Sequence, residues 1–164
     1  MKINKLDVGC GLKPQGDVNV DLYIQKTMHR GNDSTISPKT IPNFVKCDAN
    51  YLPFRDNAFT ESNCSHLLEH KGINAVKVIK EMIRVTTRKI VAEVPHRYSR
   101  TRWLKYEQHP EFHDKLFSEA SIIALFKKNG LRYLRTQITY WYFPKYILSL
   151  IRFPWAIKIE ALIQ

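Results

Sequence analysis

Two glycines and two acids in the first third of the chain have the types and the spacing of a site for a ribose-containing ligand. Gly9 and Gly11 follow a short apolar run, and Asp21 and Asp48 each end a later one. A glycine turn lets the backbone approach a ligand closely, and a carboxylate at the end of the next strand suits a ribose diol. The glycine-rich phosphate loop that ends in Gly-Lys-Ser/Thr is not in the sequence, which argues against an ATPase.

Short apolar segments that alternate with helical patterns are the elements that must position these residues. Their order predicts an α/β fold with a parallel, doubly wound sheet, in a single domain over residues 1–164. Ligands of such sheets bind beyond the carboxyl ends of the strands, so the glycines and acids are expected at one edge. The expected strands are residues 5–9, 18–22, 43–49, 60–68, 88–96, 131–143 and 157–164, and the expected helices are residues 72–85 and 118–131.

Two connections qualify this scheme. Only nine residues separate Gly11 from Asp21, too few for a crossover helix and a strand, so a tight loop is expected there. Residues 26–42 have no apolar periodicity and are expected to form a loop or a poorly formed helix. In the helix over 72–85, the apolar stripe is Ile73, Val76, Ile79 and Ile83, with Lys77, Lys80 and Glu81 turned outward.

The charge of the chain is strongly basic. The 164 residues carry a formal net charge of +11, and residues 127–158 hold seven Lys or Arg and no acid. Such a surface attracts the phosphates of nucleic acid or of anionic lipid, although a solubilising basic surface is an equal alternative. Three cysteines without metal-ligand spacing, and no secretory or membrane-spanning segment, predict a cytoplasmic protein.

An ordered series of motifs resembles the class I S-adenosylmethionine-dependent methyltransferases with a methyltransferase 11-type domain. The series is "LDVGCG", "VNVDL", "CDANYLPFRDNAF", "SHLLEH", "IKEMIRV" and "IVAEVP", and the resemblance extends from Leu6 to about Leu131. It implies a Rossmann-like methyltransferase fold with strand order 3-2-1-4-5-7-6, an antiparallel last strand and a shortened N-terminus. Lys13 and Pro14 depart from the family, since many relatives have a third small residue there.

The resemblance also implies S-adenosyl-L-methionine as cofactor and roles for individual residues. For Asp7, Asp21 and Asp48 the alternative role is to cap a turn or a helix. For Asp7, ordering of the glycine loop explains the residue as well as cofactor binding does. Ser65 and His66 are expected to border the sulfonium and the methyl acceptor. The expected cofactor-binding residues are Asp7, Gly9, Cys10 and Gly11 at the methionine part, Asp21 and Leu22 at the ribose, Asp48 and Ala49 at the adenine, and Ser65.

Histidines are the candidates for acid–base work. Methyl transfer is an in-line displacement that needs mainly alignment and desolvation, and a base is useful only if the acceptor must lose a proton. His66 and His96, each after a strand end, are the candidate catalytic residues, and His96 is expected to act either as a base or as a ligand of the methyl acceptor. His70 is expected to be structural. His109 and His113 have helical spacing, but Pro110 and the lack of a third ligand predict no metal site.

The acceptor is not identified by the sequence. With no helical pattern ahead of Leu6 to cover the site, a large or surface-bound acceptor is expected, or closure by a second subunit in a homodimer. Basic and aromatic residues in 97–106 suit single-stranded nucleic acid or a substrate loop. Residues 139–157 suit a membrane-surface or partner-binding helix, or an element of the core or of a dimer interface. The alternative function is a non-catalytic module that binds nucleic acid or anionic membrane through its basic face.

Overall fold

A seven-stranded sheet runs through the protein, in the order β3-β2-β1-β4-β5-β7-β6. The computed structural model describes residues 4–22, 38–99, 113–142 and 152–163. The five strands from β3 to β5 are parallel, and β7 is antiparallel to both β5 and β6, so the expected strand order and mixed sheet are confirmed. The strands are β1 (Lys5–Val8), β2 (Val18–Asp21), β3 (Phe44–Lys46), β4 (Phe59–Ser65), β5 (Thr86–Pro95), β6 (Tyr133–Tyr142) and β7 (Arg152–Leu162); the helices are η1 (Pro38–Thr40), a single 3-10 turn, α1 (Ala75–Val85) and α2 (Glu119–Lys128).

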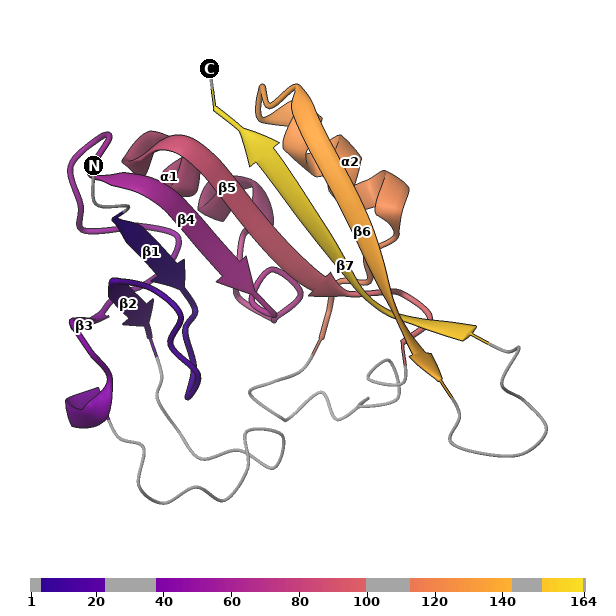
Figure 1. Ribbon diagram of the computed structural model, residues 1–164, viewed down its shortest axis with the longest axis horizontal. Helices are drawn as coiled ribbons and strands as arrows, with labels where there is room; N and C mark the ends of the chain where they lie inside the picture. The colour runs from indigo at the N-terminus through magenta and orange to yellow at the C-terminus, as the bar shows by residue number, and fades with distance from the viewer. Residues whose placement is uncertain (1–3, 23–37, 100–112, 143–151, 164) are drawn as a thin grey trace.

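The last strand is longer than the sequence predicts, whereas β6 is slightly shorter than the predicted 131–143. The final strand begins at Arg152 rather than at residue 157, and its first part pairs with the end of β6, where Tyr142 lies opposite Arg152. Figure 1 shows this two-stranded ribbon extending past the rest of the sheet. The prediction of a helix over 139–157 is therefore wrong for residues 139–142 and 152–157, which are in strands. Aromatic and β-branched residues are common in these two stretches and favour strand. Residues 143–151 lie outside the described part of the chain.

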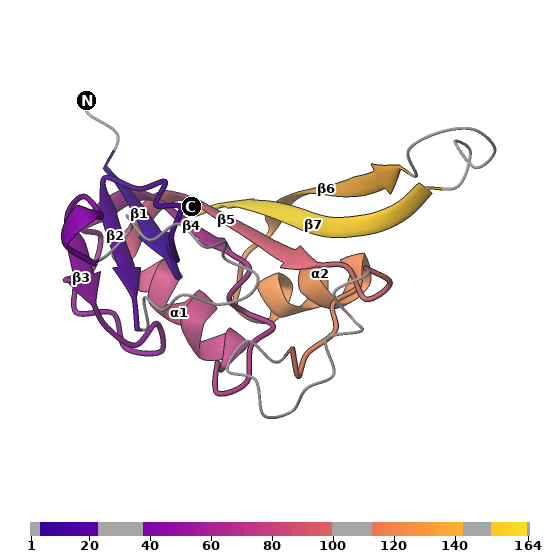
Figure 2. The same ribbon diagram turned by 90° about the horizontal axis from the view of Figure 1, so that it is seen from below.

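Both described α-helices lie against one face of the sheet, as Figure 2 shows. Alternate residues of each strand point toward the helices, and most of them are apolar and buried. The helices contribute Val78, Ile79 and Met82 from α1 and Ile122 and Phe126 from α2. The register aligns these strand residues across the sheet: Leu6, Val8, Cys64, Ile90, Ala92, Val94, Ile157 and Ile159.

The opposite face of the sheet is polar. Asp7 lies between Asn19 and Asn63 on the neighbouring strands, and Glu93 lies beside Lys158 on β7. Parallel sheets usually have helices on both faces and apolar residues on both. Within the described residues no helix covers this polar face, and the alternation of polar and apolar residues in the strands accounts for a helix layer on one face only.

A loop replaces the first crossover helix, as the short spacing predicts. Residues 9–17 lie between β1 and β2 without helical structure. Gly16 sits against the strand backbone, where a Cβ would lie 2.5 Å from the Val18 carbonyl oxygen and 2.8 Å from the Asp7 nitrogen. The Gln15 N–H donates to Asp7 Oδ2 at 2.9 Å. The loop therefore packs directly on the sheet at the place of a helix.

Helix α1 is shorter and rotated relative to its prediction. It begins at Ala75, because the Asn74 side chain accepts from the Lys77 N–H and caps the helix. Of the expected apolar stripe only Ile79 is fully buried, with Val78 and Met82 beside it. Glu81 does not simply face solvent, because Oε2 accepts from the Leu52 N–H at 2.8 Å. Helix α2 begins as expected, at a Ser118 capping box.

Candidate active site

The glycine turn and the acid of the second strand are joined by hydrogen bonds at the carboxyl edge of the sheet. The N–H groups of Gly9 and Cys10 both donate to the Val20 carbonyl, at 2.8 and 3.0 Å. The Gly11 N–H donates to Asp21 Oδ2 at 2.9 Å. Gly9 and Gly11 have φ values of 72° and 53°, which glycine adopts without strain. These bonds fix the glycine turn and the Asp21 carboxylate next to each other at the edge of the sheet.

Asp7 has a structural role in this arrangement. It is buried, and each of its carboxylate oxygens accepts one hydrogen bond, Oδ2 from the Gln15 N–H and Oδ1 from Asn63 Nδ2, both at 2.9 Å. These bonds connect β1 to β4 and to the glycine loop. Ordering of the loop, the alternative that the sequence left open, is what the geometry favours for Asp7.

Asp48 organises the loop after the third strand. Its Oδ1 accepts from both the backbone N–H and the side-chain Nδ2 of Asn50, each at 2.8 Å, so Asp48 caps the turn that follows β3. Ala49 is buried in the same turn. The Cys47 N–H donates to the Asp21 carbonyl at 3.2 Å, which places this turn beside the end of β2. Leu22, the residue after Asp21, is exposed.

The acids make this part of the edge electronegative. Burial, followed by the charges of Asp48 and Asp21, raises the pKa of the Cys47 thiol to about 11. A group of this kind stays neutral at physiological pH. An edge with two carboxylates suits a ligand that offers hydroxyl donors or carries positive charge.

Arg84 on α1 holds the same loop from behind. Its guanidinium donates to the carbonyls of Phe54 and Leu52, at 2.7 and 2.9 Å, and to the carboxylates of Asp56 and Glu81, each at 2.8 Å. Hydrogen bonding to Arg84 lowers the pKa of Glu81. A fifth bond runs from Arg84 Nε to Glu81 Oε1 at 2.9 Å. Five donors in a planar fork are needed for this pattern, and only arginine has them. This role of Arg84 was not predicted from the sequence, because nothing in "IKEMIRV" indicates a contact with a loop some 30 residues earlier.

Ser65 and His66 end the fourth strand, as expected. Ser65 is half-buried, and His66 turns the chain with a φ of 52° while its N–H donates to the Glu93 carbonyl at 2.8 Å. The His66 ring lies between two carboxylates, with Nδ1 3.6 Å from Glu69 and Nε2 3.4 Å from Glu93. These neighbours raise the pKa of His66 to about 9 against the effect of burial. At neutral pH the ring is cationic and has no lone pair to act as a base.

His96 follows the fifth strand at the same edge. Its Nδ1 accepts from the Tyr98 N–H at 3.2 Å, so the proton of the neutral ring is on Nε2. Burial, then the charge of Arg97, lowers the pKa of His96 and favours this neutral form. The ring therefore has an Nε2–H to donate. Of the two functions expected for His96, base and acceptor ligand, the hydrogen bonding favours the ligand.

The parallel strands bring these expected site residues to one edge. The residues at or just after the carboxyl ends of β1 to β5 are the turn of Gly9 to Gly11, Asp21, Asp48, Ser65 and His96. Figure 1 shows these strand ends along one side of the sheet. His109 and most of the basic, aromatic segment lie outside the described residues. The sequence also missed a convergence, because His113 pairs as an isolated bridge with His70, next to the buried Glu69. The "LLEH" motif was the only local signal for it.

A comparison with protein families shows which family the chain belongs to. Residues 6–89, which are 84 of the 164 residues, match a family described as a methyltransferase domain. The chain belongs to this methyltransferase family. The matched region runs from β1 into β5 and includes every element that holds the glycine turn, Asp21 and Asp48.

Solved methyltransferase structures share the fold. One from Thermotoga maritima, described as a possible histamine N-methyltransferase, is 15% identical with a TM-score of 0.70, over 99% of this chain and 83% of that one. One from Archaeoglobus fulgidus is 17% identical with a TM-score of 0.66, over 98% and 86%. A magnesium protoporphyrin IX methyltransferase from Synechocystis, solved with bound S-adenosylmethionine, is 14% identical with a TM-score of 0.58, over 99% and 70%. A comparison with curated proteins found no match.

Neither α-helix in the described ranges has the length and apolar composition that crossing a bilayer requires.

Proposed function

We propose that this methyltransferase family member binds S-adenosyl-L-methionine at the carboxyl edge of its sheet and transfers the methyl group to a large or surface-bound acceptor. The observation that carries the proposal is the hydrogen bond from the Gly11 N–H to Asp21 Oδ2, which joins the glycine turn to the ribose-type acid. The family match covers both residues. A solved relative with S-adenosylmethionine bound has the same fold.

The residues at the edge fit the chemistry of such a cofactor. When bound, it supplies a methyl group already activated by a positively charged sulfur. The glycine turn presents backbone with little side-chain bulk, and Asp21 can accept from ribose hydroxyls while held by Gly11. The turn capped by Asp48, with Ala49 buried in it, forms the adenine side. The acidic character of this edge favours a cationic ligand.

Few protein groups have to act on the acceptor. Ser65 and His66 border its entry at the end of β4, and His96 donates from Nε2 to an acceptor atom at the end of β5. Alignment and exclusion of water are the main demands of a displacement at an activated carbon. His66 contributes charge rather than base strength, because it lies between Glu69 and Glu93.

A large acceptor is favoured by how little of the described chain covers the edge. A loop over residues 9–17 takes the place of the first crossover helix, and no helix of the described residues lies on the polar face of the sheet. The net charge of +11 favours an acceptor that carries phosphates, as in nucleic acid or an anionic membrane. One solved relative is described as a possible histamine N-methyltransferase and another as a magnesium protoporphyrin IX methyltransferase, so the shared fold does not select among acceptor classes.

The test is binding and transfer by the purified full chain. Calorimetry with S-adenosylmethionine and S-adenosylhomocysteine should show one site, and Asp21→Asn should weaken it. A methyl-labelled cofactor incubated with fractionated cell extract, followed by nuclease, protease or lipid extraction, then assigns the acceptor class. No cofactor binding by the wild type would overturn the proposal. Binding of polyanions that weakens with salt, without transfer to any fraction, would favour a non-catalytic module.

A further inference from the structure

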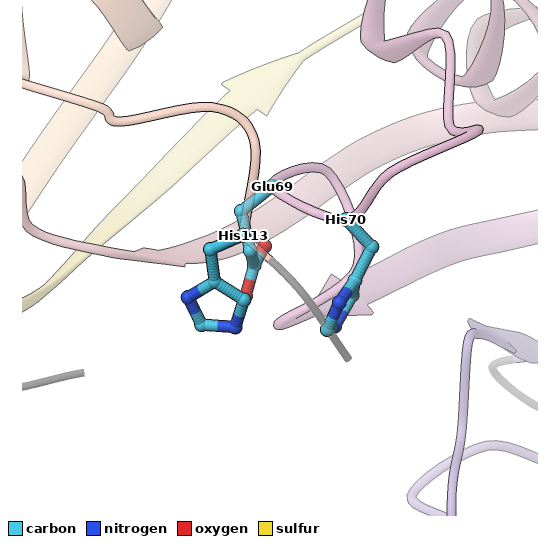
Figure 3. A group of neighbouring side chains, drawn as sticks. All are labelled: Glu69, His70 and His113. Carbon is cyan, nitrogen blue, oxygen red and sulfur yellow. The ribbon is translucent and has the colours of Figure 1, made fainter. Parts of the chain in front are cut away.

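Three side chains that could bind a metal ion converge next to the proposed site. Glu69 and His70 come from the loop after β4, and His113 comes from the segment before α2 (Figure 3). One ligand atom from each lies within 4.8 Å of the others. The backbone fixes this meeting, because the N–H groups of Asp114 and Lys115 both donate to the Glu69 carbonyl, at 3.1 and 3.2 Å. The cluster is therefore part of the folded framework.

The Glu69 carboxylate is buried with ionic neighbours but without a hydrogen bond among the described residues. The residue is fully buried, and neither carboxylate oxygen has a hydrogen-bond partner among the described residues. The closest nitrogens are His66 Nδ1 at 3.6 Å and His113 Nε2 at 3.9 Å, both beyond hydrogen-bond distance. Burial of a carboxylate without hydrogen bonds is costly, so native proteins pair such groups or give them to a metal. Both Glu69 oxygens therefore keep the capacity to accept that a metal ion would use.

His70 is held in the tautomer of a metal ligand. Its Nε2 is 2.9 Å from the His66 carbonyl oxygen, and a carbonyl only accepts, so Nε2 carries the proton. The lone pair is then on Nδ1, which is buried and has no hydrogen-bond partner within the described ranges. Metal-binding histidines are commonly oriented by such a bond from the second ring nitrogen to a carbonyl.

We propose that Glu69, His70 and His113 bind a divalent transition-metal ion of the zinc class. Two imidazoles and one carboxylate suit Zn²⁺, whereas Mg²⁺ prefers oxygen ligands only. Zinc at its usual distances holds ligand atoms about 3.3–3.6 Å apart, so atoms that lie within 4.8 Å of one another need to approach by at most about 1.5 Å. Three protein ligands leave one tetrahedral position for water or another ligand.

The charges around the cluster are consistent with one bound cation. His66 faces Glu69 from the same loop, and in the absence of an ion it is the nearest positive group. Lys115 lies on the other side, with Nζ donating to the His70 carbonyl at 3.1 Å and to Asp114 Oδ1 at 2.7 Å. The Lys115 charge is thus already paired with Asp114. The competing explanation is that Glu69 serves only to hold His66, in which case the cluster has no affinity for metal.

An ion at this position would join two parts of the chain that are far apart in sequence. It would pin the segment before α2 to the loop after β4, at the carboxyl edge where the acceptor is proposed to enter. Binding to the folded state alone raises the melting temperature in proportion to the logarithm of metal concentration. This effect does not depend on methyl transfer, so its failure and the failure of the proposed function are distinguishable.

The experiment measures Zn²⁺ binding to the purified full chain after treatment with a chelator. Calorimetry should give one Zn²⁺ per chain, thermal unfolding should shift upward with Zn²⁺, and Co²⁺ should give the visible absorption of a tetrahedral site. Glu69→Gln and His113→Asn should each weaken Zn²⁺ binding by more than about 100-fold, the upper range for loss of a mere supporting residue. His96→Asn, a histidine change outside the cluster, should leave Zn²⁺ binding unchanged.

Three results would overturn the assignment. They are a wild-type chain that binds no Zn²⁺, Zn²⁺ binding that survives in both ligand variants, and Mg²⁺ binding as tight as that of Zn²⁺. Far-UV circular dichroism keeps the variants interpretable. Glu69→Gln removes a buried charge and should fold, and His113 is only partly buried, so loss of binding by folded variants is assignable to the missing ligands.

Discussion

The backbone N–H of Gly11 donates to Oδ2 of Asp21 at 2.9 Å, across the carboxyl ends of two adjacent parallel strands. This bond holds the carboxylate in one orientation before any ligand binds. Because an ordered group loses less entropy on binding, Asp21 is prepared to accept hydrogen bonds from a diol. The first prediction follows from this relationship.

Asp21→Asn is expected to weaken binding of S-adenosylhomocysteine by about 10–100-fold, since hydrogen bonds to a charged group contribute about 1.5–3 kcal/mol. Calorimetry on the folded variant measures the change. The matched control is Asp17→Asn, an exposed acid just before β2 and at the opposite end of that strand from Asp21, which should bind as the wild type does. Equal affinity of Asp21→Asn and wild type would remove Asp21 from the binding site.

Asp7→Asn is expected to reduce the free energy of unfolding by about 1–3 kcal/mol. An asparagine has one acceptor oxygen, and its NH₂ group would then face either the Gln15 N–H or Asn63 Nδ2, both donors. Denaturant titration measures the loss, and Asp17→Asn on the exposed part of the same loop is the control. Unchanged stability with lost cofactor affinity would instead give Asp7 the binding role that the family resemblance implies.

Gly16→Ala is expected to destabilise the fold by about 1–3 kcal/mol, because the added methyl group meets backbone that has no room to move. Its Cβ would lie 2.5 Å from the Val18 carbonyl oxygen and 2.9 Å from the Lys5 carbonyl oxygen. Thermal or denaturant unfolding tests this. Gln15→Ala, which keeps the N–H that binds Asp7, should lose little. A Gly16→Ala protein as stable as wild type would mean that the loop does not pack on the sheet as described.

Arg84→Lys is expected to lower the free energy of unfolding by about 1–3 kcal/mol and to weaken cofactor binding as well. A lysine cannot reach the carbonyls of Leu52 and Phe54 and the Glu81 carboxylate together. The loop that carries Asp48 then loses its support. Parallel unfolding and calorimetric titrations separate the two effects, and Lys80→Arg on the exposed face of α1 is the control. If only stability falls, the loop does not contribute to the cofactor site.

The stability of the wild type relative to His96→Asn is expected to fall as the pH is lowered through about 6.5. Burial lowers the pKa of His96 below its ordinary value of 6.5, so the unfolded chain takes up a proton at a pH where the folded chain does not. The folded state therefore loses stability between 6.5 and the lower folded pKa. The Asn oxygen can still accept from the Tyr98 N–H. Denaturant titrations at about pH 7.5, 6.5 and 5.5 measure the difference in free energy of unfolding between the wild type and His96→Asn. A difference that stays constant with pH would contradict the lowered pKa of His96.

Much of the architecture was predictable because local patterns encode it. The run from "LDVG" to "VNVD" carries apolar residues at strand spacing with glycines between them, and β1 and β2 form there. The Ser118 cap likewise marks the start of α2. Boundaries were less predictable, as α1 shows, because Asn74 rather than Gly72 caps it and its buried face depends on the sheet beneath.

The candidate site was only partly predictable, because local patterns do not encode contacts between distant residues. The sequence by itself determined which residues end the parallel strands, and hence that Gly11, Asp21 and Asp48 share one edge. Tertiary structure alone decided which distant groups meet: Arg84 with the loop at Leu52, and His113 with Glu69. Periodicity is a property of neighbouring residues, whereas a contact between residues tens of positions apart depends on how the elements pack. Packing of the elements therefore decided both that Arg84 supports the loop at Leu52 and that His113 lies beside Glu69.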